Sequence, residues 1–278
     1  ICQAALHVLR AIGEYLSSEQ TKKVLLALEK VFADRITSVR CDDAVRYQNV
    51  SVRREVVTVL GIVGKSLPDD QAEKVLALLE KAFDDQNKDL HFRAANALRC
   101  ISEDLSVNQI SKALTLFEKA LTNQEVGVRR RAAETLYVID VNLLASQMEK
   151  TLVVLEKLLA DQDEKIRSEA ACVLESIDEY LPADQMEKAL SLLEKALTTK
   201  EINTHNKAFN ALDRIGGEKV RDLLLRQLKN ATNKRTFNNI VDLLKARYPD
   251  DQLVAEALKN LSSPAQKKPG AGAPLDEF

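Results

Sequence analysis

One stretch of the sequence decides the fold: LEKLLADQDEKIRSEAACVLESI, at residues 155–177. Its second half carries small and aliphatic residues at offsets of 0, 4, 8 and 11, which form one face of an α-helix, namely Ile166, Ala170, Leu174 and Ile177. The residues before the polar turn at 161–164 also follow a helical spacing. The stretch therefore predicts a first helix (helix A), a short turn and a second helix (helix B).

The same unit recurs along the chain. A Leu- or Phe-Glu-Lys signature appears five times, with its glutamate at residues 29, 80, 118, 156 and 194. The last three gaps are each 38 residues, and the first gap is 51 residues, which is 38 plus an insertion of 13. Two such helices cannot bury their apolar stripes alone. We therefore predict an all-α fold, a right-handed α-solenoid of about six to seven helix pairs with a 38-residue period.

The turns carry a second pattern, an aspartate followed six residues later by an arginine near the start of helix B. Asp161 with Arg167 has this spacing, and so has Asp34 with Arg40. With the helix pairs, this pattern resembles the HEAT-repeat family over roughly residues 1–216. The resemblance implies that these side chains hydrogen-bond between neighbouring units. Three units keep the spacing with altered residues: Asp85 with His91, Asn123 with Arg129, and Thr199 with His205.

The array has irregular ends. Ile1 aligns with Ile166, so residues 1–216 begin inside a helix B, and we expect the chain to be a fragment of a longer protein. Residues 217–261 read as three degenerate helices that cap the exposed apolar end of the array. The last segment, 262–278, is rich in Pro, Gly and charge, and we expect it to be disordered.

The long first unit contains an insertion at about residues 35–50. The sequence TSVR at 37–40 is echoed by NVSVR at 49–53, so helix B has two candidate starts. We expect a loop or an extra short helix here, projecting from one edge of the solenoid. Insertions in repeat arrays commonly lie on the binding side, but a neutral surface loop fits the sequence equally well.

Composition and motifs argue against catalysis. The chain has 40 Lys and Arg against 42 Asp and Glu, a formal charge of −2, which excludes a strongly basic surface for nucleic acid but not a local patch. It has no phosphate-binding glycine motif, no nucleophile elbow and no HExxH, and its three histidines lie far apart. We expect a non-enzyme without cofactor, metal or membrane span. The four isolated cysteines favour a cytoplasmic or nucleocytoplasmic location.

The B helices are expected to line the concave side of the solenoid, which makes their outward positions the candidate site. These positions come two, six and nine residues after the first core aliphatic residue, with the third position on the flank. In the inserted unit they select Arg54, Thr58 and Gly61. The predicted partner-binding residues are Arg54, Phe92, Arg93, Asn96, Arg99, Arg130, Arg131, Glu134 and Tyr137.

Phe92 and Tyr137 are the predicted anchors, because an apolar ring at an exposed position needs a reason. Aromatic residues and arginines are also the types enriched at interface hot spots. The sequence thus favours a scaffold that binds a protein or peptide, with an acidic segment or helix lying along the arginines. Two alternatives stay open: a regulatory region of a larger multidomain signalling enzyme, and a nucleic-acid scaffold, which the low net charge disfavours. Oligomeric state is not predicted.

Overall fold

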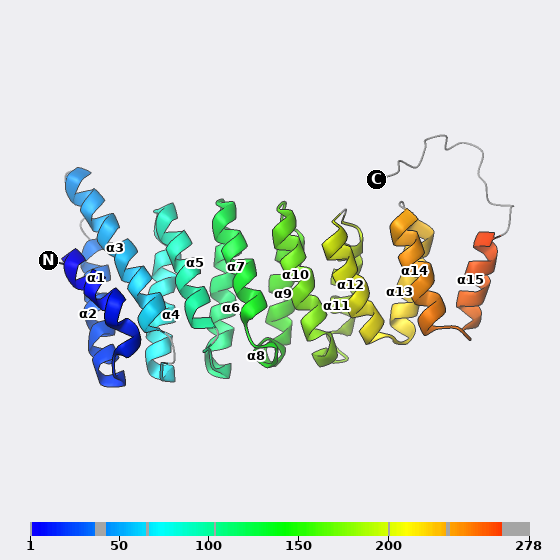
Figure 1. Ribbon diagram of the computed structural model, residues 1–278, viewed down its shortest axis with the longest axis horizontal. Helices are drawn as coiled ribbons and strands as arrows, with labels where there is room; N and C mark the ends of the chain where they lie inside the picture. The colour runs from blue at the N-terminus through cyan, green and yellow to red at the C-terminus, as the bar shows by residue number, and fades with distance from the viewer. Residues whose placement is uncertain are drawn as a thin grey trace. The chain divides into compact units, whose positions relative to one another are not determined.

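The computed structural model describes residues 2–36, 43–64, 67–102, 104–199, 201–231 and 234–262; within them, the side chains at 2–4, 10, 12, 14, 33–36, 43–49 and 261–262 are left undescribed. These ranges hold fifteen α-helices and two short 3-10 helices, and no strand (Figure 1). The predicted all-α solenoid of repeated helix pairs is therefore confirmed.

The helices alternate between two series, as the period predicts. The A helices are α2 (Ser18–Ile36), α4 (Asp69–Phe83), α6 (Val107–Leu121), α9 (Met148–Leu159), α11 (Met186–Leu197), α13 (Gly217–Asn230) and α15 (Gln252–Ser262). The B helices are α1 (Cys2–Ile12), α3 (Asp43–Val63), α5 (Lys88–Ser102), α7 (Val126–Val138), α10 (Glu164–Ile177), α12 (Ile202–Ile215) and α14 (Lys234–Arg247). A short helix, α8 (Val141–Ser146), precedes α9, and the 3-10 helices Gly13–Tyr15 and Asp178–Tyr180 follow α1 and α10.

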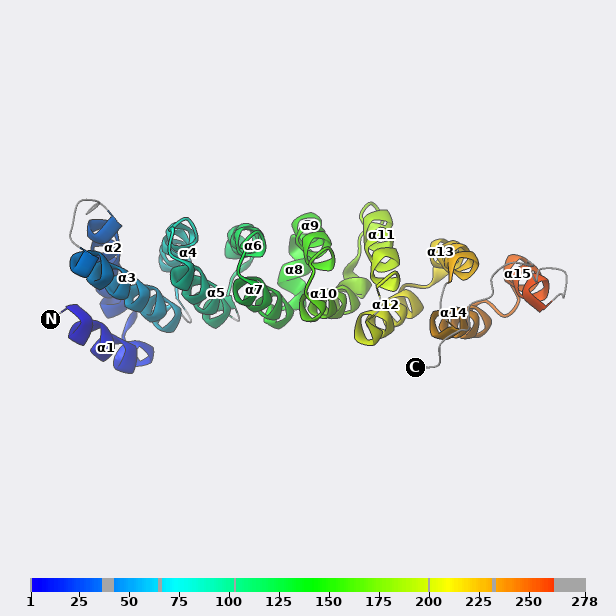
Figure 2. The same ribbon diagram turned by 90° about the horizontal axis from the view of Figure 1, so that it is seen from above.

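The chain divides into two compact units, Ile1–Val173 (unit 1) and Leu174–Phe278 (unit 2). In unit 1, α3, α5 and α7 pack side by side in one row, and α2, α4 and α6 form the other row (Figure 2). In unit 2, α12 packs against α11 and α14, and α13 packs against α11, α14 and α15. In both unit 1 and unit 2, the apolar stripe of a helix is therefore buried against the other helix of its pair and against helices of the neighbouring repeats.

The predicted core face of helix B is buried. On α5 it consists of Leu90, Ala94, Leu98 and Ile101, each 2% exposed or less. The equivalent residues of α10 are buried as well, and so are those of the α7 repeat, where the last one, Ile139, directly follows the helix. An alanine in the middle of each face lets neighbouring helices approach closely, while the leucines fill the space between the two rows. The spacing that identified the repeat is thus the spacing of its core.

The insertion differs from expectation. Residues 43–50 form neither a loop nor a separate short helix, because they are the first two turns of α3, which runs unbroken for 21 residues against 15 in α5. The segment DAVRYQNV contains no glycine or proline to stop a helix, and its aspartate stands in the first turn, where a negative charge is favourable. The remaining part, residues 37–42, lies outside the described residues.

The C-terminal region forms the three helices expected there: α13, α14 and α15. A Gly-Gly pair joins α12 to α13, and Gly216 has φ 57° and ψ −159°, a conformation that is essentially restricted to glycine. The tail predicted to be disordered falls almost entirely outside the described residues, since α15 ends at Ser262.

Candidate partner-binding surface

The predicted partner-binding residues lie on three adjacent helices of unit 1: α3, α5 and α7. Both predicted anchors are exposed, Phe92 by 41% and Tyr137 by 56%. Arg99 and Arg130 are also exposed, whereas Arg54, Arg93, Asn96, Arg131 and Glu134 are half-buried. We call the outward positions of α5 and α7 the B-helix surface; they are Phe92, Arg93, Asn96, Arg99, Arg130, Arg131, Glu134 and Tyr137.

The repeat sets the arrangement of this surface. Phe92 and Arg130 occupy equivalent positions near the starts of α5 and α7, two residues after the first core aliphatic residue of each helix. Arg99 and Tyr137 occupy equivalent positions seven residues later. Because α5 packs against α7, each end of the surface combines one aromatic ring with one arginine. Gly127, in the first turn of α7, lies next to the Phe92 ring, because a Cβ added there would be in ordinary van der Waals contact with it at 3.7 Å.

Most of the arginines are already engaged by carboxylates, which the sequence analysis did not foresee. Arg54 pairs with Asp89 at 3.0 Å. Arg130 donates two hydrogen bonds to Asp163, at 3.0 and 2.5 Å, and thereby holds the pKa of Asp163 below its usual range. Both carboxylates belong to the next repeat, 33 to 35 residues further along the chain. Two members of the predicted basic row, Arg54 and Arg130, are therefore held in ion pairs that cross from one repeat to the next.

Glu134 is neutralised in the same way. Lys165 donates a 2.5 Å hydrogen bond to one carboxylate oxygen, and Arg131 donates a 2.7 Å bond to the other. The Lys165 bond is the main reason why the pKa of Glu134 lies below its usual range; burial opposes it, and the positive charges of Arg131 and Arg99 add to the lowering. Glu134 is thus an ionised, engaged carboxylate at neutral pH.

Two arginines of the B-helix surface have no carboxylate partner. Arg93 donates a 2.8 Å hydrogen bond to the hydroxyl of Thr58 on α3. The guanidinium of Arg99 makes no hydrogen bond or ion pair within the described part of the chain, although its positive charge helps to lower the pKa of Glu134. These two cations, and not the whole arginine row, remain available to an external acid.

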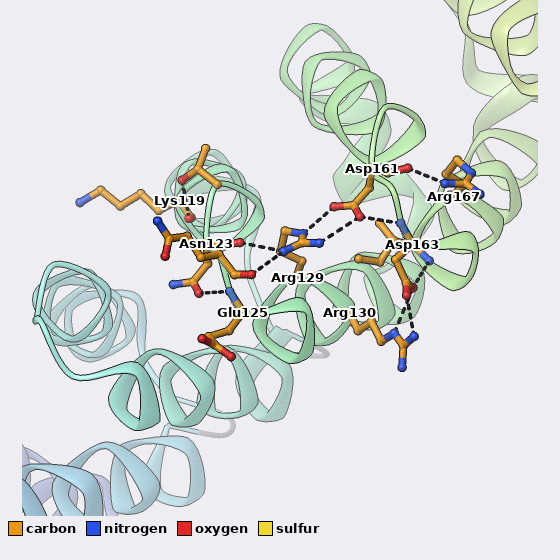
Figure 3. A network of polar contacts seen from close by, with 11 residues as sticks. Lys119, Asn123, Glu125, Arg129, Arg130, Asp161, Asp163 and Arg167 are labelled. Carbon is orange, nitrogen blue, oxygen red and sulfur yellow. Dashed lines mark hydrogen bonds and ion pairs between the residues drawn. The ribbon is translucent and has the colours of Figure 1, made fainter.

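The turn residues form the hydrogen-bonded ladder that the HEAT resemblance implies. Arg129 donates to both carboxylate oxygens of Asp161 in the next turn, at 2.6 and 3.2 Å, and to the backbone carbonyl of Asn123 in its own turn, at 3.0 Å (Figure 3). Arg167 likewise donates a hydrogen bond to a backbone carbonyl in its own turn, that of Asp161, at 2.6 Å. Arg53 donates a hydrogen bond to the carboxylate of Asp85 in the next turn, at 2.6 Å.

His91 replaces an arginine in this ladder. Its Nε2 lies 2.5 Å from the carbonyl oxygen of Asp85, and its Nδ1 lies 2.7 Å from the amide nitrogen of Asn123. A carbonyl can only accept, so Nε2 carries the proton and Nδ1 accepts from Asn123. The amide of Asn123 is oriented by a second bond, in which its oxygen accepts from the Glu125 backbone N–H at 2.9 Å. This link between repeats is a neutral hydrogen bond, whereas the neighbouring links of the ladder are ion pairs.

Other ladder positions have different outcomes. His205 is buried on α12, with its Nδ1 near the carbonyl oxygen of Glu201 and its Nε2 near the hydroxyl of Thr236. The pair formed by Asp34 and Arg40 lies outside the side chains that the structure describes. The ladder is therefore present in unit 1 from Arg53 to Arg167.

The recurring Glu-Lys signature has a structural role on the A helices. Lys119 on α6 bonds Glu80 on α4 at 3.2 Å and Asp84 at 2.9 Å. Lys157 on α9 bonds Glu118 on α6 at 2.7 Å. The glutamate of one signature thus pairs with the lysine of the next, so the repeat at 38 residues also links successive A helices electrostatically.

Within the described residues, no three His, Cys, Asp or Glu side chains are grouped as a metal site would require. The helices described here are also too short or too polar to span a bilayer.

Comparisons with known proteins agree with this architecture. The family model for HEAT repeats matches residues 151–245, from α9 into α14. A search of curated proteins gave no match.

Several solved structures are similar in fold. Computationally designed armadillo repeat proteins for modular peptide recognition share 22% identity over 77% of this chain and 98% of theirs, with a TM-score of 0.51. A designed armadillo repeat protein in complex with the peptide (KR)4 has 22% identity over 77% of this chain and 97% of its own, at a TM-score of 0.48.

Kap121p bound to RanGTP has 16% identity and a TM-score of 0.51; the match covers 92% of this chain but only 31% of that protein. At these identities the likeness concerns the fold. The chain thus resembles HEAT repeats over residues 151–245, and the described chain has the fold of a HEAT/armadillo-like helical-repeat solenoid.

Proposed function

We propose that this chain is a non-catalytic scaffold that binds a segment of another protein on the B-helix surface of unit 1. The observation that carries the proposal is the exposure of two large rings, Phe92 and Tyr137, on one surface of adjacent helices. The repeat gives each ring an arginine at the equivalent position of the adjacent helix, and aromatic residues and arginines are the types enriched at interface hot spots. Stacked repeats provide extended binding surfaces of this kind.

The chemistry of the surface favours a partner segment with apolar side chains and an acidic residue. The rings would bury against the apolar side chains. Arg99, which has no partner in the described part of the chain, stands at the position next to Tyr137, where it could form a charge-assisted hydrogen bond with a carboxylate. Arg54, Arg130 and Arg131 are already paired, so they would contribute less than the sequence suggested.

The same pairing weakens the nucleic-acid alternative. Affinity for phosphates depends on unpaired Lys and Arg side chains that release counterions. Three of the five arginines proposed for the site are neutralised by carboxylates. Some of the similar structures are described as made for peptide recognition or as bound to RanGTP; for this chain, the proposal rests on its own residues.

Replacing both rings by alanine should reduce capture of the partner at least about tenfold, because a truncated aromatic hot spot typically costs 1–2 kcal/mol or more. The unfolding midpoint should change little, since both rings are largely exposed. The measurement is a pull-down from cell lysate with the intact chain and with Phe92→Ala/Tyr137→Ala, quantified by mass spectrometry.

The matched control is Tyr15→Ala/Val107→Ala, which removes exposed apolar side chains of unit 1 that lie outside the B-helix surface. The control should retain the partner. Equal retention by both double variants would reject the surface, and unfolding of Phe92→Ala/Tyr137→Ala would show that the rings serve the core.

A further inference from the structure

The junction between the α5 and α7 repeats is held by a histidine, where the next junction uses an arginine. His91 lies half-buried on α5, and Asn123 lies in the turn that leads into α7. At the next junction Arg129 and Asp161 form an ion pair, and both side chains stay charged near neutral pH. A histidine, in contrast, changes its charge between about pH 5 and pH 8. The link at His91 is therefore the part of this ladder that responds to mild acid.

Two backbone groups fix the direction of every hydrogen bond in the link. The carbonyl of Asp85 can only accept, so the Nε2 of His91, 2.5 Å away, carries a proton. The backbone N–H of Glu125 can only donate, so Asn123 presents its side-chain oxygen to it, at 2.9 Å. The NH₂ group of Asn123 then faces the Nδ1 of His91 at 2.7 Å. Nδ1 must accept this hydrogen bond, which it can do only while the ring is neutral.

Protonation of His91 removes the acceptor from the link. A proton on Nδ1 would point at the NH₂ group of Asn123, and a reversed amide would turn that group toward the backbone N–H of Glu125. Either arrangement sets two donors face to face. Because only the neutral ring completes the link, the proton binds more readily when the link is open. Acidification therefore favours the open link.

The charged groups of the helices and turns around His91 already have partners. They come from α3, the turn before α5, the start of α5, α6, the turn before α7 and α7 itself. Their pairs are Arg53 with Asp85, Arg54 with Asp89, Lys119 with Asp84, Lys88 with Glu125, and Arg129 with Asp161. Each carboxylate near the link is thus engaged by a lysine or an arginine, so a protonated ring would have to compete for a counterion.

The link stands at one end of the B-helix surface. Phe92 directly follows His91 on α5, and its ring lies next to Gly127 in the first turn of α7. The ion pair of Lys88 with Glu125 joins the same two repeats, but it is exposed, and exposed pairs stabilise little. Loss of the link from His91 to Asn123 should therefore loosen the contact between the Phe92 ring and α7.

We propose that His91 and Asn123 form a pH-sensitive junction between two repeats of unit 1. Protonation of His91 breaks its hydrogen bond with Asn123 and loosens the start of α5 from the start of α7. The Phe92 end of the B-helix surface is then firmly held at neutral pH and loosened in mild acid. The test needs no partner protein, so its result does not depend on whether the B-helix surface binds one.

The test is an NMR titration of the full-length, ¹³C,¹⁵N-labelled chain from about pH 7.5 to about pH 5.5. The ring nitrogens of His91 report its protonation, and the nuclear Overhauser effect between the Phe92 ring and Gly127 reports the contact. We expect the proton on Nε2 alone at the upper pH, and a contact that weakens with the same midpoint as the ring titrates. In urea unfolding, the folding equilibrium constant should fall about fivefold over this range relative to His91→Gln.

Variants separate His91 from other groups that titrate. His91→Gln is neutral at every pH and should lose the response, although it keeps Glu169 and Asp178, whose pKa values are raised by burial. His7→Gln is the matched control, because it removes an exposed histidine of α1 and should respond like the intact chain. Asn123→Asp should reverse the response, since a carboxylate accepts a hydrogen bond from the protonated ring and tightens the junction in acid.

Three outcomes would overturn the proposal. The first is protonation of His91 with no change in the contact between Phe92 and Gly127. The second is an equal pH response in His91→Gln, and the third is a response of Asn123→Asp in the same direction as that of the intact chain. The first outcome is read from the intact chain alone, so the proposal stays testable even if a variant fails to fold.

Discussion

Arg129→Ala should lower the free energy of unfolding of unit 1 by about 4 kcal/mol, because it removes one partner of a mostly buried ion pair. Arg129 links two neighbouring repeats of unit 1, because it donates two hydrogen bonds to Asp161 and one to the carbonyl of Asn123. The side chain of Asp161 is only 9% exposed, so it would be left as a buried charge without its partner. Urea unfolding followed by circular dichroism measures the loss.

A matched control separates burial from charge pairing as such. Lys88→Ala breaks the exposed ion pair with Glu125, which also joins neighbouring units, and it should cost less than about 1 kcal/mol. Adding Asp161→Asn to Arg129→Ala should restore part of the stability, since the amide carries no charge to bury. A loss on Arg129→Ala no larger than that on Lys88→Ala would contradict the role given to the ladder.

The stabilisation by Asp161 should also depend on pH. Burial acts to raise the pKa of Asp161, but the hydrogen bonds from Arg129 and from the backbone of Asp163 outweigh it, so the pKa lies below its ordinary value. A carboxyl whose pKa is lowered by folding contributes stability above its unfolded pKa, and this contribution is lost as the pH falls through the folded value. The difference between the intact chain and Arg129→Ala should therefore shrink below about pH 4.

Arg214→Ala should destabilise unit 2 by about 3 kcal/mol at neutral pH, for a related reason. Arg214 donates a 2.6 Å hydrogen bond to Asp178, whose side chain is only 2% exposed. Burial raises the pKa of Asp178 above its ordinary value, and this effect outweighs the opposing effect of Arg214, which acts to lower that pKa. Without Arg214, burial of the ionised carboxylate would be uncompensated.

The sign of the pH dependence follows from that raised pKa. A carboxyl whose pKa is raised by folding favours the folded state when it is protonated, so its cost appears as the pH rises through the window between the unfolded and folded pKa. Arg214→Ala should therefore approach the stability of the intact chain as the pH is lowered from 7 toward 4, and Arg214→Ala/Asp178→Asn should be more stable than Arg214→Ala at pH 7. A deficit that is the same at every pH would contradict this account.

Much of the fold could be predicted from the sequence because the core repeats. The positions of Leu90, Ala94, Leu98 and Ile101 recur in register, and burial of apolar area fixes helix type and pairing together. The insertion was predicted less well, since two possible helix starts could not be ranked without tertiary contacts. Continuous helix from Asp43 resolved the choice for residues 43–50.

The candidate site was harder to predict than the fold. Helical spacing gave the correct exposure for Phe92 and Tyr137, but it placed Gly61 at the surface, where the structure buries it. A Cβ at Gly61 would lie 2.8 Å from the Cα of Ala97, so this glycine allows α3 and α5 to pack closely. The B-helix positions likewise could not show that Arg130 meets Asp163, because the acid belongs to the following unit.

The central claim, that a partner protein lies on the B-helix surface of unit 1, is tested most directly by site-specific photo-crosslinking in cell lysate. A photoreactive phenylalanine analogue would replace Phe92 or Tyr137 in turn, and Thr115, an exposed residue of the A helix α6, would serve as the control position. The account predicts one protein crosslinked from both ring positions and not from Thr115. A partner crosslinked from Thr115 but from neither ring position would contradict it.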